Sequence, residues 1–162
     1  MADAAATYLE KRFQGEVYGE AIFRVMAERC ADPANAKKLR VLEQLERETK
    51  EALRPAVKDF GFSGVEGAEH VKAGKELGAK LAPVPWSMLM VGLKKELEGF
   101  VSQFEQAETL APPGREALFR HVTRHERALL AFVECEIAGA PPEESLAPIV
   151  AILAGAGTVL SS

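Results

Sequence analysis

Apolar residues recur at alternating spacings of three and four along the long segments of this chain. This spacing matches the 3.6-residue turn of an α-helix and places the apolar side chains on one face. Strand signals are nearly absent, because the chain has no run of alternating β-branched residues and no Asn-Gly or Asp-Gly turn. Most prolines fall at the edges of the periodic segments, where a helix tolerates them. The sequence therefore predicts an all-α fold of long amphipathic helices.

The helices can be placed along the chain from this periodicity and from the turn residues. Asp32 and Pro33 mark one helix start, and Pro55 is expected to kink the end of that helix. Two tight hairpins joined by one long crossover are typical of a ferritin-like four-helix bundle. A chain of 162 residues is about one domain, so we expect a single helical-bundle domain over residues 1–162. The expected long helices cover about 3–30, 34–60, 86–110 and 115–139, with a short helix near 66–82 in the crossover and a terminal helix at about 143–157.

Composition excludes several classes of protein. The net charge is −4 and there is no basic tract, which argues against nucleic-acid binding. Cys30 and Cys135 form no ligand pair and indicate a reducing compartment, and the start of the chain has no apolar signal segment, so we expect a cytoplasmic protein. The apolar segment 146–160 contains Pro148 and falls short of the roughly 20 residues that span a bilayer. We expect it to be a packing helix or a partner surface.

Ionisable residues interrupt the predicted apolar stripes. Burying an isolated carboxylate costs several kcal/mol, so a folded chain keeps one there only if it is paired, protonated or bound to a cation. Glu20 and Glu46 lie thirteen residues before and after residue 33, which places them at the same height in an antiparallel hairpin. The stripes run Leu9, Phe13, Glu16, Glu20, Phe23, Ala27, then Leu39, Leu42, Glu46, Thr49, Leu53, Ala56, Phe60, and later Leu118, Val122, His125, Leu129, Phe132.

The second hairpin turns near residue 112, which puts His125 opposite the region of Glu96 and Glu98. Groups from four helices would then meet in one layer, an oxygen-rich site with an imidazole nitrogen that suits a hard divalent metal. Two stripes are open on the third long helix: one contains Glu96, and the other runs Met90, Leu93, Leu97, Phe100, Phe104 without an acid.

The first helix also allows a second register, in which Val17, Ile22 and Met26 form the core and its glutamates reach water. Glu46 has an alternative too, because it can pair with Lys50 on its own helix. The predicted metal ligands are Glu20, Glu46, Glu96 and His125. The weaker candidates are Glu16, Glu98 and His121, and of these we expect Glu16 and His121 to be exposed.

Three segments, "GEVYGEAIFRVMAE", "LEQLERETKEALRP" and "RHERALLAFVECEIAG", resemble the rubrerythrin-like branch of the ferritin-like superfamily. The resemblance implies a carboxylate-bridged di-iron site in which each half-bundle supplies one Glu and one Glu-x-x-His motif. By position it assigns Glu20, Glu46 and His125 to ligand places, with Glu96 or Glu98 as a further acid. Thr49 stands at the histidine place of one motif, and Val122 stands at the acid place of the other.

With both motifs incomplete, at most three carboxylates and one imidazole remain. This set predicts a single iron, manganese or zinc ion rather than a bridged pair, and it leaves open whether the protein is an oxidoreductase. His121 and His125 could also coordinate zinc together with Glu126, but "HVTRH" lacks the metalloprotease glutamate. The alternative function is a metal-free helical bundle that associates with itself, as a dimer, or with a partner protein through the apolar terminal helix.

Overall fold

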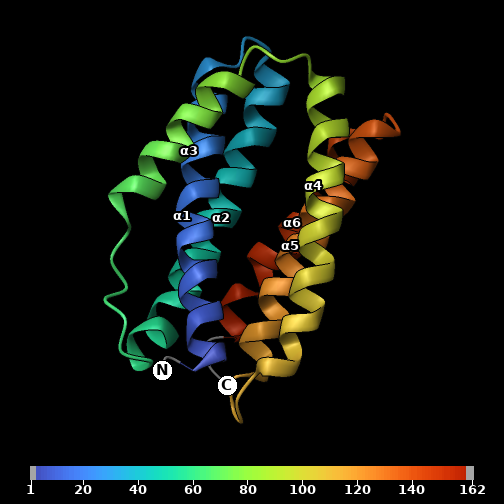
Figure 1. Ribbon diagram of the computed structural model, residues 1–162. Coiled ribbons are helices and arrows are strands. Elements are labelled where there is room, and N and C mark those ends of the chain that lie inside the picture. Colours follow the sequence, from blue (N-terminus) through green and yellow to red (C-terminus); the bar gives the residue numbers. More distant parts are fainter. Residues whose placement is uncertain (1–2, 160–162) are drawn as a thin grey trace. The chain divides into compact units, whose positions relative to one another are not determined.

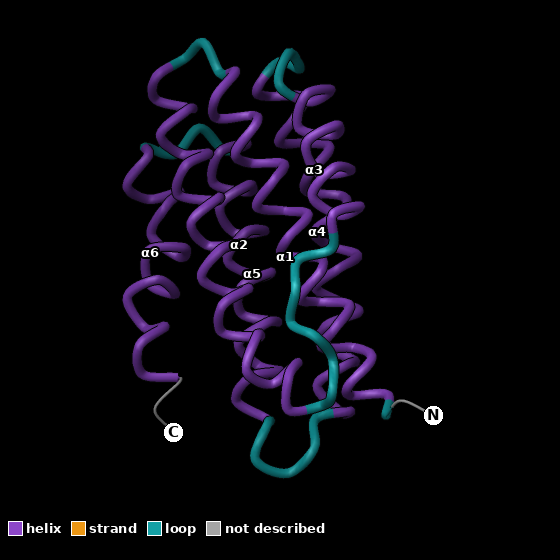
Figure 2. Tube along the Cα trace, turned by 90° about the vertical axis from the view of Figure 1, so that its left-hand side faces the viewer, coloured by secondary structure: helices purple, strands orange, loops and turns teal. Residues whose placement is uncertain are grey.

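The computed structural model describes residues 3–159, and this part of the chain is helical without any strand (Figure 2). The prediction of an all-α fold is confirmed. The elements are α1 (Ala4–Arg29), α2 (Pro33–Asp59), α3 (Ala68–Leu81), α4 (Trp86–Ala107), the short 3-10 helix η1 (Glu108–Leu110), α5 (Glu116–Ile137) and α6 (Pro142–Val159).

Each predicted helix is present, with both ends within three residues of the expected position. The start of α2 shows why a helix boundary can be predicted from the sequence. The Asp32 carboxylate accepts hydrogen bonds from the backbone N–H groups of Ala34 (2.8 Å) and Asn35 (3.2 Å), and Pro33 takes the first helical position. Pro55, expected as a kink near the end of this helix, lies inside α2, which continues to Asp59. Residue 160, the last of the apolar C-terminal segment, lies outside the described residues.

The chain divides into two compact units, Met1–Pro83 and Val84–Ser162. In the first unit α1 and α2 form a helical hairpin, and α3 packs against α1 (Figure 1). In this way α1 contacts two neighbouring helices and is covered on two sides. The core of this unit is apolar, as the periodicity predicted, and its fully buried side chains include Leu9, Phe13, Leu39, Leu42, Leu45 and Leu53.

Two glycines on α3 allow it to approach α1 closely. A Cβ atom added at Gly74 would lie 2.5 Å from the carbonyl oxygen of Tyr18, and one at Gly78 would lie 2.7 Å from that of Ile22. These glycines are four residues apart and therefore lie on one face of α3. The sequence analysis predicted the helix but missed this contact, because only the tertiary structure shows which backbone the glycines face.

The connection between α2 and α3 is a long loop (Figure 2), and side chains of both hairpin helices bind it. The Gln14 side-chain amide donates to the carbonyl of Val65 (3.0 Å) and accepts from the N–H of Gly67 (2.9 Å). The Arg54 guanidinium donates to the carbonyl of Gly64 and lies 5.0 Å from the centre of the Phe13 ring. These contacts fix residues 64–67 against α1 and α2.

The second unit repeats the hairpin theme. α4 and α5 pack together, and α6 packs against α5, so α5 is the helix with two helical neighbours (Figure 1). The Glu136 carboxylate on α5 accepts hydrogen bonds from the Trp86 indole (2.9 Å) and from the Ser145 hydroxyl (2.6 Å). One side chain thereby joins the first turns of α4 and α6 to the end of α5.

The question left open on α4 is decided by burial. Its buried side chains are Leu89, Met90, Leu97, Phe104 and Ala107, whereas Glu96 and Glu98 are exposed. Of the acid-free stripe, Met90, Leu97 and Phe104 are buried but Phe100 is 38% exposed, so that stripe is confirmed only in part. The expectation that Glu96 lies on the packed face is wrong. Among residues 3–159 no helix is both long enough and apolar enough to cross a bilayer.

Substituting alanine for Gly74 should destabilise the protein, because the new methyl group would meet a helix backbone that cannot move aside cheaply. We expect a loss of about 1–3 kcal/mol in the free energy of unfolding, measured by denaturant titration. The control is Gly99→Ala on α4, where an added Cβ meets nothing within 4 Å. That variant should gain about 0.5–1 kcal/mol from helix propensity. Equal effects of the two substitutions would contradict the close packing of α3.

Candidate metal centre

Four ionisable side chains are buried on facing turns of α1 and α2. Glu16 and Glu20 lie four residues apart on α1, and Glu46 and Lys50 lie four residues apart on α2. Residues at this spacing occupy one face of a helix, one turn apart. All four belong to the buried residues of the first unit. The predictions that Glu20 and Glu46 are buried are confirmed, whereas the expectation that Glu16 is exposed is wrong.

Glu16 is only 4% exposed, and its carboxylate lies beside that of Glu46 on α2, whereas α3 packs against α1 at Tyr18 and Ile22. The stripe predicted for α1 described the face that meets one neighbour. A helix with two neighbours buries a wider arc than a single stripe, so Val17 and Met26 of the alternative register are buried together with the glutamates. Every residue of the first register is buried, so that register is confirmed, whereas the second register is wrong in placing the glutamates in water.

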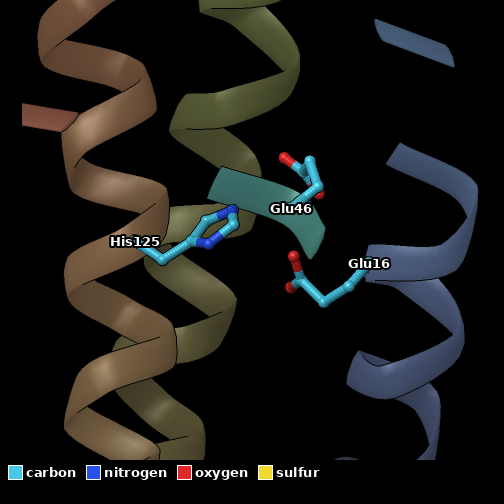
Figure 3. Close-up of side chains that lie close together, drawn as sticks. All are labelled: Glu16, Glu46 and His125. Atoms are coloured by element: carbon cyan, nitrogen blue, oxygen red, sulfur yellow. The ribbon is translucent and has the colours of Figure 1, made fainter. Parts of the chain in front are cut away.

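The carboxylates of Glu16 and Glu46 lie close together, each offering an oxygen within 4.8 Å of the other's (Figure 3). Two ionised carboxylates at this distance repel each other by about 3 kcal/mol at an effective dielectric constant of roughly 20. A buried pair of this kind needs a shared proton or a neighbouring cation. Carboxylate oxygens are the ligands that hard divalent ions prefer.

Gly19 makes room for the Glu46 carboxylate on the surface of α1. A Cβ atom added at Gly19 would lie 2.7 Å from the carboxylate carbon of Glu46, much closer than van der Waals contact. A glycine inside a helix costs about 1 kcal/mol relative to alanine. The close approach of Glu46 gives this glycine a steric role, which the sequence analysis did not recognise.

Glu20 has a different environment from the Glu16–Glu46 pair. Its carboxylate forms ion pairs with Lys50 and with Arg24 (2.6 Å), and Arg47 lies 3.9 Å away. Glu20 was predicted as a metal ligand, but the structure gives it protein cations as partners. It borders the carboxylate pair, one helical turn away on α1.

The ion pairs continue to both sides of Glu20. Burial lowers the pKa of Lys50, but hydrogen bonds to Glu20 and Glu66 outweigh it, so the net pKa is raised. Burial raises the pKa of Glu43, but hydrogen bonds from Arg24 and Arg40 outweigh it, so that pKa is lowered. Both groups are therefore held in their charged forms at neutral pH. The sequence offered only a local pairing of Lys50 with Glu46, whereas the structure pairs Lys50 across helices.

His125 on α5 is almost fully buried, as predicted, and Figure 3 shows its side chain. His121 is buried too, contrary to the expectation that it is exposed. The helix α5 packs against both α4 and α6, so it buries more than one stripe of side chains. Burial, followed by the charges of His125 and Arg124, lowers the pKa of His121 to about 4. His121 is therefore neutral at pH 7.

Two further positions belong to the motifs that the resemblance suggested. Thr49 and Val122 are fully buried on α2 and α5, so both places at which a ligand is missing face inward. Glu98 is exposed on α4, where it pairs with Lys94 at 3.7 Å. In the described part of the chain, α4 supplies no acidic side chain to the buried set.

No family model, no curated protein and no solved structure matches this chain. The resemblance to ferritin-like proteins therefore rests on the sequence segments quoted above.

Stability should fall between pH 6.5 and pH 4 because of His121. The unfolded chain takes up a proton on this histidine near pH 6.5, whereas the folded chain does so only near pH 4. Acid therefore favours the unfolded state across this window, by up to about 3 kcal/mol. Denaturant titrations at several pH values should show a shallower pH dependence for His121→Leu. The control His70→Gln changes a partly exposed histidine and should keep the native slope. An unchanged slope in His121→Leu would contradict the assignment.

Proposed function

We propose that this protein is a ferritin-like metal-binding protein that holds one divalent ion, iron, manganese or zinc, through Glu16 and Glu46. The observation that supports the proposal is the buried carboxylate pair, which needs positive charge to be stable in its ionised form. The proposal replaces Glu20 and Glu96 of the sequence prediction with Glu16. Glu20 already has cationic partners, and Glu96 is exposed.

The number of ligands favours one ion over two. The di-iron site that the ferritin-like resemblance implies takes four carboxylates and two imidazoles, whereas the proposed set has the carboxylates of Glu16 and Glu46 and the imidazole of His125. Three such ligands suit a single divalent ion.

His125 is the proposed nitrogen ligand. Two observations support this role. His125 lies in the apolar stripe of α5, and it corresponds to a ligand histidine in the ferritin-like resemblance. An imidazole nitrogen can join carboxylate oxygens in binding a divalent ion. The proposal includes the ferritin-like arrangement, in which the α1–α2 and α4–α5 hairpins form one four-helix bundle.

The two free cysteines fit a cytoplasmic protein, because thiols stay reduced there.

The proposed centre limits the chemistry that the protein can perform. With one ion, a redox step at iron or manganese transfers one electron at a time, and zinc would act only as a structural or Lewis-acid centre. The proposal is therefore metal binding, with catalysis as a separate question. The same residues would serve storage or sensing of an ion equally well.

The first test measures metal content. Apo protein titrated with Mn²⁺, Fe²⁺ or Zn²⁺ should bind about one equivalent by calorimetry and by elemental analysis after desalting. Glu16→Gln and Glu46→Gln should each lower the affinity at least about tenfold, because each removes a charged ligand. Glu96→Gln is the control, since it removes the same charge from an exposed position. Binding of less than a tenth of an equivalent, unchanged by these substitutions, would overturn the proposal.

Two further variants separate the parts of the site. Gly19→Ala keeps every ligand but pushes the Glu46 carboxylate from its place, so it should weaken binding while the helix stays intact by circular dichroism. His125→Ala tests the nitrogen ligand and, with it, the pairing of the two hairpins. If His125→Ala binds the ion as tightly as the native protein, the carboxylates act without it and the bundle arrangement loses its support.

A second candidate function is self-association through α6. Val150 is 52% exposed on this helix, although its neighbour Ile149 is fully buried. The apolar helix α6 therefore presents an apolar side chain to solvent. A second copy of the chain could cover this face and form a homodimer. This function does not need a metal ion.

Val150→Glu should convert such a dimer to a monomer, because association would bury an unpaired carboxylate at a cost of several kcal/mol. Removal of residues 143–162 should have the same effect. Sedimentation velocity or light scattering measures the mass directly. Val91→Glu is the matched control, because Val91 is also exposed, at 61%, but lies on α4. A dimer that survives both changes on α6 would exclude this surface.

A further inference from the structure

We propose that the Lys50 ammonium serves as a tethered second cation of the metal centre and thereby restricts the centre to one metal ion. This inference rests on the proposed function and specifies its stoichiometry. It assigns Lys50 a role as a positioning residue next to the ligands, with Glu20 as the carboxylate that it shares with the centre.

The surroundings of Lys50 are those of a bound cation. Its Nζ contacts the carboxylate of Glu20 on α1 and lies 2.6 Å from a carboxylate oxygen of Glu66 in the α2–α3 connection. The side chain is only 5% exposed. Carboxylates from two separate segments therefore converge on one buried positive charge that α2 itself supplies.

The connection is built to hold this arrangement. Gln14 binds residues on both sides of Glu66 through hydrogen bonds to Val65 and Gly67. Arg54 lies 3.6 Å from the Glu66 carboxylate and also donates to the carbonyl of Gly64. The Glu66 carboxylate is thus positioned by its neighbours, and Lys50 occupies the space between it and Glu20.

The tethered charge lies one turn from the proposed ligands on both helices. Glu20 follows Glu16 by four residues, and Lys50 follows Glu46 by four residues, so each step is about 6 Å along its helix axis. A second divalent ion at Glu20 and Glu66 would have to share these carboxylates with the ammonium and would meet its repulsion in a medium of low dielectric constant. The ammonium is also held in its charged form by Glu20 and Glu66. A second ion is therefore excluded while Lys50 is present.

Removing the ammonium should change the number of ions bound. Lys50→Met and Lys50→Gln leave Glu20 and Glu66 without this partner, and each variant should bind two equivalents of Mn²⁺ where the native protein binds one. Elemental analysis and calorimetric titration give the stoichiometry. The matched control is Arg24→Gln, which removes another cation from Glu20 but keeps Lys50. It should still bind one equivalent.

A double variant guards against simple loss of folding. Glu20→Gln with Lys50→Met removes both charges of the pair, so no unpaired buried charge remains there, and it should return to one equivalent. Circular dichroism and the melting temperature verify that each variant is folded. If Lys50→Met is unfolded, Lys50→Gln and the double variant still give the comparison.

The outcomes separate this inference from the proposed function. One equivalent in the native protein and one in both folded Lys50 variants would overturn the inference and leave the metal centre intact. No binding by the native protein would overturn the proposed function. Two equivalents bound by the native protein would overturn the restriction to one ion. The expected result is one equivalent in the native protein, two in the Lys50 variants and one in the double variant.

Discussion

The balance of buried charge between α1 and α2 is the constraint on which the first unit depends. Four glutamates, Glu16, Glu20, Glu43 and Glu46, are buried on these helices, and ionised carboxylates in a low-dielectric interior require positive partners. The protein supplies those partners at one end of the set, where Lys50 and Arg24 meet Glu20. At the other end, the Glu16 and Glu46 carboxylates lie within 4.8 Å of each other. A divalent ion there is the complement that we propose.

The helix α1 packs against two others. Gly74 and Gly78 bring α3 close to the α1 backbone, and α2 packs against the face that carries the glutamates. The same geometry recurs in the second unit, where α5 lies against both α4 and α6. In each unit the helix with two neighbours holds the buried ionisable residues that matter most, Glu16 on α1 and His121 on α5. Packing, rather than local sequence, decides their exposure.

The candidate site therefore combines buried charged side chains with a small set of possible ligands. Gly19 gives the Glu46 carboxylate its place on α1, and the α2–α3 connection gives Glu66 its place beside Lys50. Thr49 and Val122, which face inward where the ferritin-like resemblance implies ligands, leave the set too small for a bridged metal pair. A single ion beside a lysine is chemically a simpler centre than two ions, and it suits binding better than two-electron chemistry.

The sequence by itself determined the helices, because periodicity, proline positions and the Asp32 cap act locally and leave their marks in neighbouring residues. It also determined that Glu20, Glu46 and His125 are buried, since each interrupts an apolar stripe. Only the tertiary structure decided that Glu16 replaces Glu20 beside Glu46, that Glu96 faces water, and that Lys50 reaches across to Glu20. These outcomes depend on which second helix covers a face and on which side chain meets a given carboxylate, and such contacts between distant residues are not written in the spacing of a single helix.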